Sequence, residues 1–394
     1  MNILFITKEL PYPPNNGCRN RTFNIIKALS KNNRISLLCH GEPEKDAERV
    51  SGMRGLCESV DLVPENRGDH KWLIYIEAFL SLFSIRPFGI RIRYSQSMKN
   101  KAHEIVDQDH IDLIFCDSIY QASNMPERRC FRILSEHNIE STIIHRYIKV
   151  EKNIFKKVYA FLEWLKMRHY ENRMWRLFDR CIVVSEGDKR EMSSRVKNVS
   201  IEVTPNGVDI DYFSPAKVNV KPFSLVYVGQ MNWYPNSDAM IYFLENVYPL
   251  IKKDIPQVSL CIVGNNPPEM IRDIAKENKS ITITGLVDDT RPYIAESELF
   301  IVPLRIGGGT RLKILEAMAM GKTIVSTSIG CEGITISDGE NIFIADSPAH
   351  FAKTVIELFK KPNLRDKVKA SARRLVEENY SWRKVTENMQ GITI

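Results

Sequence analysis

Residues 303–321, PLRIGGGTRLKILEAMAMG, hold the densest group of side chains in this sequence that could carry chemistry. Three consecutive glycines precede a stretch of helix-forming composition, and glycine lets a backbone approach a ligand closely. The free N–H groups and the dipole at the start of a helix attract anions. Arg311 and Lys313 add two positive charges there, where they oppose the dipole. The combination predicts a phosphate site; the alternative is a flexible turn with two solvated cations.

Glu316 is an acid within the otherwise apolar face of the helix expected over residues 310–320. A lone helical glutamate is usually exposed to solvent. Because this one lies about one and a half turns beyond the glycines, we expect it to accept hydrogen bonds from vicinal hydroxyls of a ligand.

Short apolar runs alternate with helical segments along the whole chain and must position these residues. The first half contains runs at 3–6, 35–39, 113–116, 131–134 and 181–184, with a turn-rich loop at 11–17 before the first helix. The second half contains runs at 225–228, 260–263, 281–284, 299–302 and 323–326, most of which end at Gly, Pro or Ser. Such runs are typical of buried parallel strands. We predict an α/β fold with two Rossmann-like domains whose parallel sheets face each other across a cleft, with ligands at the carboxyl ends of the strands.

The predicted boundaries place the first domain at 1–200, a linker at 201–222 and the second domain at 223–365. Residues 366–394 are expected to form C-terminal helices, broken near residues 380–382. Packing of this tail onto the first domain is one alternative.

Composition excludes several classes of protein. The 394 residues are 43% hydrophobic and 26% charged, which suits globular domains and excludes global disorder. The eight cysteines are scattered without a C-x-x-C pair, which favours reduced thiols over a zinc site or disulfides. MNILFIT is unlike a signal peptide, and the apolar stretch 72–85 is too short to span a membrane. We therefore expect a cytoplasmic protein.

Residues 307–327, GGGTRLKILEAMAMGKTIVST, resemble the donor-site signature GGGTRLKILEAMAMGKPVVST of a bacterial subgroup of GT4 glycosyltransferases, enzymes of the GT-B fold. Further matches follow in the family's order along essentially the whole chain. They are the loop ending at Gly17, SEHN at 135–138, VVSEGDK at 183–189, PNGVD at 205–209, VGQMNWYPNSDA at 228–239, IVG at 262–264, TGLVDD at 284–289 and CEGI at 331–334.

The resemblance implies a nucleotide-sugar donor and a role for each matching residue. Glu316 would bind the ribose hydroxyls, Leu286 after Gly285 would meet the base through its main chain, and His137 would lie beside the transferred sugar and the acceptor. The implied donor-binding residues are Gly17, Asn206, Gly229, Gln230, Gly285, Leu286, Gly307, Gly308, Gly309, Thr310 and Glu316; the catalytic ones are His137, Arg311 and Lys313; on the acceptor side are Asn16, Arg19 and Arg21.

Two departures from the wider family concern the same site. The first acid of the family's Glu-x7-Glu pair is replaced by Gly308, and Gln230 and Asn236 stand where the family has Arg and Lys. The phosphate charge must then be met elsewhere, and Arg311 with Lys313 are the expected substitutes.

These features predict a retaining, metal-independent glycosyltransferase of the hexosyltransferase type. It would move sugar from a nucleotide sugar, expected to be UDP-linked, to a glycan or lipid-linked acceptor in bacterial surface polysaccharide or glycolipid synthesis. No cofactor or metal is expected, because no Asp-x-Asp lies near the glycines and Asp288-Asp289 belongs to the nucleobase loop. The alternatives are a UDP-sugar epimerase on the same scaffold and a non-catalytic nucleotide-sugar-binding subunit.

Most of the formal net charge of +7 lies in one segment. Residues 146–180 hold ten basic and four acidic residues interleaved with apolar ones, and residues 72–94 form a second apolar patch with Arg86, Arg91 and Arg93. One hypothesis is peripheral contact with an anionic membrane, on the inner face of the plasma membrane. The alternative is a core-facing helix with a solvated basic side. Nucleic acid is not expected as a partner, since no binding motif is present.

Overall fold

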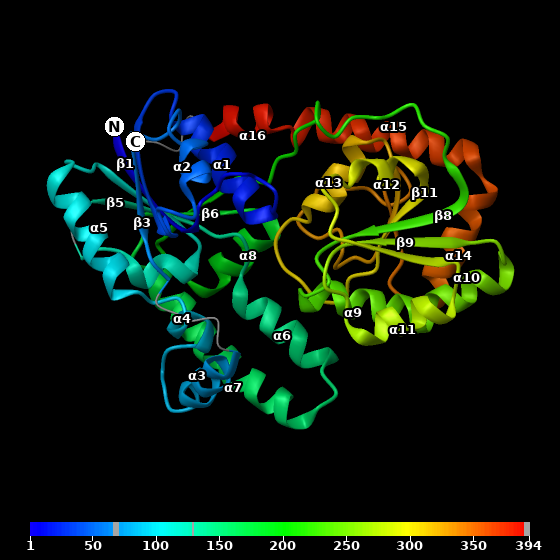
Figure 1. Ribbon diagram of the computed structural model, residues 1–394, viewed down its shortest axis with the longest axis horizontal. Helices are drawn as coiled ribbons and strands as arrows, with labels where there is room; N and C mark the ends of the chain where they lie inside the picture. Colours follow the sequence, from blue (N-terminus) through cyan, green and yellow to red (C-terminus); the bar gives the residue numbers. More distant parts are fainter. Residues whose placement is uncertain (66–70, 128–129, 390–394) are drawn as a thin grey trace. The chain divides into compact units, whose positions relative to one another are not determined.

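The computed structural model describes residues 1–65, 71–127 and 130–389, and the chain forms two compact units. The first unit comprises Met1–Pro205 with the chain from Thr386, and the second comprises Asn206–Val385. In each unit, helices lie on both faces of one parallel sheet (Figure 1). This is the α/β architecture that the alternating apolar runs predict. Among the helices of the described residues, none is long and apolar enough to cross a membrane.

The first unit contains a seven-stranded parallel sheet in the order β3-β2-β1-β4-β5-β6-β7. Its strands are β1 (Asn2–Glu9), β2 (Arg34–His40), β3 (Ser59–Val63), β4 (Leu113–Asp117), β5 (Phe131–Ser135), β6 (Arg180–Val183) and β7 (Ser200–Val203). Its helices are α1 (Gly17–Leu29), α2 (Ala47–Ser51), α3 (Lys71–Ser81), α4 (Phe88–Arg91), α5 (Gln96–Gln108), η1 (Ile119–Asn124), α6 (Glu140–Val150), α7 (Ile154–Trp175) and α8 (Glu186–Arg195). The strand order reverses between β1 and β4, which makes their carboxyl ends a topological switch point.

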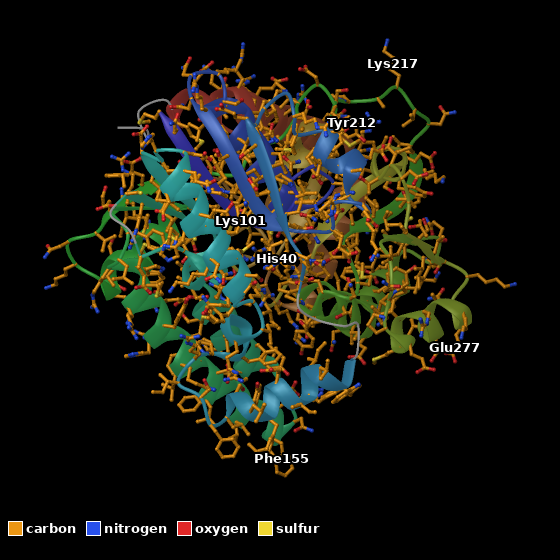
Figure 2. All side chains as sticks on the ribbon, turned by 60° about the vertical axis from the view of Figure 1, so that its left-hand side comes forward. His40, Lys101, Phe155, Tyr212, Lys217 and Glu277 are labelled. Carbon is orange, nitrogen blue, oxygen red and sulfur yellow. The ribbon has the colours of Figure 1, made fainter. Side chains whose placement is uncertain are left out.

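The alternation of side chains along β1 divides the core of this unit into two layers. Ile3 and Phe5 pack into one hydrophobic cluster, while Leu4 and Ile6 pack into the other. Helix α5 covers the second layer and carries Lys101 on its outer side (Figure 2). Because both faces of the sheet are covered, its central strands β1, β2 and β4 are buried on both sides and largely apolar without alternation.

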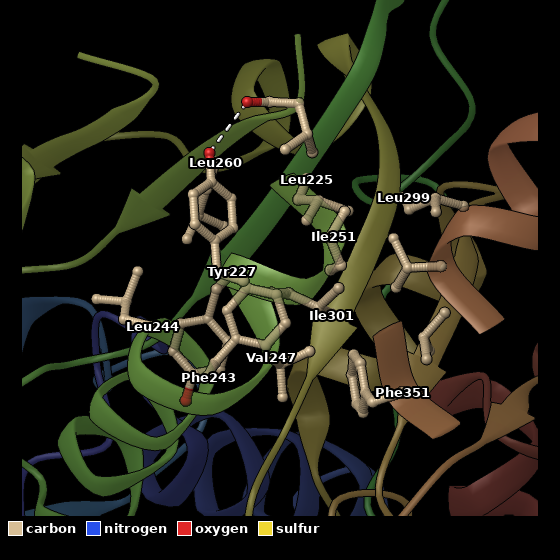
Figure 3. Close-up of a cluster of buried hydrophobic side chains, with 14 of the residues drawn as sticks. Leu225, Tyr227, Phe243, Leu244, Val247, Ile251, Leu260, Leu299, Ile301 and Phe351 are labelled. Atoms are coloured by element: carbon tan, nitrogen blue, oxygen red, sulfur yellow. Dashed lines mark hydrogen bonds between the residues drawn. The ribbon is translucent and has the colours of Figure 1, made fainter. Parts of the chain in front are cut away.

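The second unit has a six-stranded parallel sheet in the order β10-β9-β8-β11-β12-β13. Its strands are β8 (Lys221–Val228), β9 (Ser259–Val263), β10 (Ile281–Gly285), β11 (Ser297–Val302), β12 (Thr323–Ser326) and β13 (Phe343–Ile344). Its helical segments are α9 (Tyr234–Tyr242), η2 (Phe243–Val247), α10 (Tyr248–Asp254), α11 (Glu269–Glu277), α12 (Arg291–Glu296), α13 (Leu312–Ala319), α14 (Pro348–Lys360) and α15 (Pro362–Asn379), and α16 (Trp382–Met389) follows. One core layer gathers Leu225 and Tyr227 of β8 with Phe243 and Phe351 (Figure 3).

All ten predicted apolar runs coincide with strands, except that Val184 lies one residue beyond β6. The sequence reasoning missed β3, β7 and β13, which are edge strands of their sheets. Edge strands bury less surface, so they tolerate short and partly charged sequences such as SVDLV and SIEV.

The structure divides the chain at somewhat different points from the sequence. The expected linker 201–222 includes the end of β7 and the start of β8, and Val208 within it pairs with Ser381. The expected C-terminal element 366–394 is shared between the units. Ala372 and Val376 of α15 are buried in the second core, whereas Met389 of α16 is buried in the first.

Gly264, directly after β9, meets the backbone of Gly229 so closely that an added Cβ would overlap the Gly229 carbonyl oxygen. We expect Gly264→Ala to destabilise the protein by roughly 2 kcal/mol or more, because a backbone neighbour cannot swing aside. Gly187→Ala is the control, since its Cβ would lie 3.5 Å from Ser185 Oγ, an ordinary contact. Urea denaturation of both variants measures the difference, and equal midpoints would contradict the expectation.

Candidate active site

The glycine turn before α13 is shaped by the side chain that follows it. Arg311 folds back and its Nη1 donates to the carbonyl oxygen of Gly309 at 3.0 Å. A Cβ at Gly307 would collide with this guanidinium, and Gly309 has a φ of +64°, a conformation that favours glycine. The turn therefore needs glycine at 309 for its backbone conformation, and the folded-back Arg311 fills the space beside Gly307 and brings one cation against the start of α13.

Lys313, in the first turn of α13, is held by residues of β8 and α9. Its Nζ donates to Tyr227 Oη at 3.1 Å and to Asn236 Oδ1 at 3.0 Å, and it lies 4.3 Å from the centre of the Tyr227 ring. Tyr227 Oη itself donates to Asn236 Oδ1 at 2.7 Å. Burial, together with the charge of Arg311, lowers the pKa of Lys313 to about 7.

Gly229 makes room for this ammonium group at the carboxyl end of β8. A Cβ at this position would lie 2.8 Å from Lys313 Nζ and 2.9 Å from Asn236 Nδ2. Asn236 Nδ2 donates to the carbonyl oxygen of Gln230 at 2.9 Å, while the Gln230 residue is exposed. Asn236, the second departure from the wider family, thus serves as an anchor for Lys313.

Glu316 lies one turn further along α13 and is half-buried. Burial raises its pKa to about 7, against the opposing charge of Lys313. One short helix therefore carries an acid and a base that both titrate near neutrality. Such paired perturbations are typical of functional sites.

The remaining predicted donor residues of the second unit lie at the same edge of its sheet. Asn206 Nδ2 donates to the carbonyl oxygen of Thr310 at 3.5 Å. Gly285, with a φ of +73°, pairs with Gly264, which in turn meets Gly229. Leu286, directly after β10, is 79% exposed. These residues lie close together because the carboxyl ends of parallel strands meet at one edge of the sheet.

His137 follows β5 in the first unit, and its Nε2 lies 2.6 Å from Asp117 Oδ1 at the end of β4. Thr22 Oγ1 donates to the other carboxylate oxygen of Asp117 at 2.7 Å. Burial alone would lower the pKa of His137, but Asp117 and the neighbouring Cys18 outweigh it and raise the pKa to about 10. The imidazole is therefore positively charged at neutral pH and acts as a hydrogen-bond donor rather than a base.

The predicted acceptor-side residues differ in exposure. Asn16 caps α1, which begins at Gly17, by accepting from the backbone N–H of Arg19 at 2.9 Å. Arg19 pairs with Glu9, its Nε lying 2.6 Å from Glu9 Oε2. Arg21 is fully buried and donates to the carbonyl oxygens of Thr204 and Pro205 at 3.0 and 3.2 Å. Its contacts tie α1 to the chain that follows β7.

Sequence reasoning did not single out Tyr227, Asp117 or Thr22, which hold the predicted residues in place. The only sequence feature that could have identified them is their position in the chain. Tyr227 and Asp117 lie at or near the carboxyl ends of strands, and Thr22 lies in α1. In residues 1–65, 71–127 and 130–389, no group of three His, Cys, Asp or Glu side chains lies close enough together to hold a metal ion.

Two doubly wound units joined in one chain define the GT-B fold, and solved structures agree. Sucrose-phosphate synthase from Thermosynechococcus elongatus superposes with a TM-score of 0.73 at 13% identity, over 99% of this chain and 98% of that one. HepE from Anabaena, solved with UDP-glucose, superposes with a TM-score of 0.67 at 13% identity, over 100% of this chain and 99% of that one.

The sequence comparisons identify the family. Residues 15–212 match the family model described as Glycosyltransferase Family 4, and residues 222–361 match the model described as Glycosyl transferases group 1. A relative described as an uncharacterized 44.6 kDa protein in the cps region of Klebsiella pneumoniae is 25% identical over 97% of each chain. The chain belongs to glycosyltransferase family 4 and is a GT-B glycosyltransferase.

The charge on His137 is directly measurable. We expect 13C-labelled histidine spectra to show His137 protonated well above neutral pH, and Asp117→Asn to move its pKa toward the ordinary value of about 6.5. The other histidines serve as internal controls, and His137→Gln gives the assignment. Because the folded pKa is raised, the pair stabilises the protein fully below about pH 6.5, and the contribution is lost as the pH rises through about 10. A pKa near 6.5 for His137 in the unchanged protein would contradict the assignment.

Proposed function

We propose that this glycosyltransferase uses a UDP-sugar and transfers the sugar, with retention and without a metal, to a glycan or lipid-linked acceptor in bacterial surface polysaccharide or glycolipid synthesis. The observation that carries the donor assignment is that Lys313 and Glu316, on the helix after the glycine turn, both have pKa values shifted to about 7. It rests also on the resemblance of residues 307–327 to the family's donor-site signature.

The diphosphate of the donor would lie at the start of α13. There the backbone N–H groups, Arg311 and Lys313 supply positive charge to the leaving group, which is how such a site would stabilise the transition state without a metal. Lys313 is poised near its pKa in the free protein, so an adjacent diphosphate would raise that pKa and keep the ammonium charged.

Glu316 would accept hydrogen bonds from the ribose hydroxyls, which requires its carboxylate form. The charged His137 of the first unit would lie beside the transferred sugar and the acceptor, as the family resemblance implies. The anchor that Asn236 provides for Lys313 supports a rearranged site over a non-catalytic one. Conversion of a UDP-sugar to its epimer in the absence of any acceptor would instead favour the epimerase alternative.

A thermal-shift screen over UDP-, GDP-, dTDP- and ADP-sugars tests the donor site. We expect a UDP-sugar to raise the melting temperature most, and Glu316→Ala to remove most of that rise, because the ribose loses its acceptor. Glu340→Ala is the matched control, since Glu340 is an exposed acid in the same unit. Equal shifts for the unchanged protein and Glu316→Ala would reject the proposed role of Glu316, and a larger shift with another nucleotide would reject UDP.

The pH dependence of UDP-glucose binding follows from the two pKa values near 7. Below pH 7 Glu316 gains a proton and becomes a poorer acceptor of hydrogen bonds from the ribose, whereas above pH 7 Lys313 loses its positive charge. We therefore expect calorimetric affinity to peak near pH 7 and to fall on either side by up to about tenfold for each pH unit. Glu316→Gln should remove the fall in affinity below pH 7, and Lys313→Met should remove the fall above pH 7. A profile that neither variant alters would contradict both roles.

A further inference from the structure

Helix α7 exposes an unusual number of apolar side chains over its first three turns. Six apolar side chains point to solvent at helical spacing, and they are Ile154, Phe155, Val158, Phe161, Leu162 and Leu165. The buried side of the same helix carries two acids, Glu163 and Glu171, which are 7% and 0% exposed, together with Ala160, Met167 and Trp175. A surface helix of a globular protein normally has the opposite arrangement, so the exposed apolar face requires an explanation.

Hydrogen bonds keep α7 in this orientation. Glu163 accepts from Ser81 Oγ at 3.1 Å and from the backbone N–H of Phe88 at 2.7 Å. Glu171 accepts from the backbone N–H of Ser141 at 3.0 Å and from Arg195 Nη2 at 2.7 Å. Rotating the helix to bury its apolar face would leave buried donors, among them the backbone N–H of Ser141 and the guanidinium of Arg195, without their acceptors, which is costly.

Helix α3 and the residues after it present a second apolar face beside the first. Its exposed apolar residues are Trp72, Ile74, Tyr75, Ile76, Phe79, Leu80, Leu82, Phe83 and Ile85. Ser81 at the end of α3 is buried, with its Oγ 3.0 Å from Tyr159 Oη and its carbonyl oxygen accepting from Lys166 Nζ at 2.8 Å. These bonds join α3 to α7, and we call the combined surface of residues 72–85 and 154–165 the α3–α7 face.

The α3–α7 face is the largest exposed apolar feature of the described chain. It holds fifteen of the 25 exposed large apolar side chains of the described residues. Among them Phe83 is 80% exposed and Ile85 is 83% exposed. Phe155, at 83%, projects from the start of α7 away from the sheet of its unit (Figure 2). Aromatic side chains on short helices at such a surface suit the boundary between lipid headgroups and acyl chains.

Cations border this face. Arg86, Lys152, Lys156 and Arg168 are exposed, while the acid within α3, Glu77, is paired with Arg91 at 3.1 Å. Positive charge around an apolar centre is complementary to anionic lipid headgroups. A second copy of the chain docked face to face would bring the same cations toward one another, which disfavours self-association through this surface.

We propose that the α3–α7 face docks this enzyme onto an anionic lipid bilayer, with its apolar side chains in the headgroup region and its cations on lipid phosphates. Docking of this kind goes beyond the proposed function and stands without it. Where the acceptor is lipid-linked, the same contact keeps the first unit at the surface that carries the acceptor.

Flotation of the full-length protein with vesicles tests the proposal without reference to catalysis. We expect binding to vesicles of phosphatidylcholine with phosphatidylglycerol, weaker binding at high salt, and little binding to phosphatidylcholine alone. Phe83→Ser with Phe155→Ser should lower partitioning at least about tenfold, because the apolar anchor is lost. Lys152→Glu with Lys156→Glu should lower binding to the anionic vesicles only.

Leu250→Ser is the matched control, since Leu250 is an exposed apolar residue of α10 in the second unit. Its partitioning should equal that of the unchanged protein, and all variants should retain the unchanged melting temperature and donor-induced thermal shift. Failure of the unchanged protein to float with anionic vesicles would overturn the proposal. So would equal flotation of the Phe83 and Phe155 double variant, or a dimer in analytical ultracentrifugation that this variant abolishes.

Discussion

His137 and Glu171 each hold a charge largely out of water, and specific partners offset the cost of that transfer. The partners of Lys313 offset it only in part, because burial still lowers the pKa of Lys313 to about 7. Tyr227 and Asn236 surround the ammonium of Lys313, and Asp117 holds the imidazolium of His137. The rest of each site follows from these pairs. A side chain at Gly229 would displace the Lys313 ammonium and the Asn236 amide from their present positions, because both lie within 3.0 Å of where its Cβ would be. The same desolvation brings Lys313 and Glu316 to pKa values near 7, where a ligand can shift them.

The hydrogen bonds of buried carboxylates also account for the exposed apolar surface of α7. Glu163 and Glu171 draw one side of α7 inward through their hydrogen bonds, so the apolar side faces outward. The chain thereby keeps a surface that its own fold does not cover. The orientation of α7 therefore accounts both for the carboxylates on its inner side and for the apolar residues on its outer side.

The strands and the donor loop were predictable from local pattern alone. Ten apolar runs marked ten strands. For most of them the reason is burial on both faces of a parallel sheet, which leaves an uninterrupted apolar signal, while the edge strand β10 was marked by the alternating sequence ITIT. The edge strands β3, β7 and β13 gave no such signal, since half-covered strands accept polar residues. The glycine turn and α13 were visible in residues 307–320, although Tyr227, Asp117 and Thr22 were not, because their roles depend on neighbours distant in the chain.

By itself the sequence determined the two α/β halves, the family resemblance and the residue types of the donor loop, since these depend on short-range periodicity and spacing. The tertiary structure decided that Asn236 anchors Lys313, that His137 is charged, and that Arg21 is buried as a tie within the first unit. It also showed how residues 146–180 are exposed: α7 buries Ala160, Met167 and Trp175, while its apolar side chains between residues 154 and 165 face solvent. Burial and pKa depend on which groups meet in space, and helical periodicity shows two faces without showing which one turns inward.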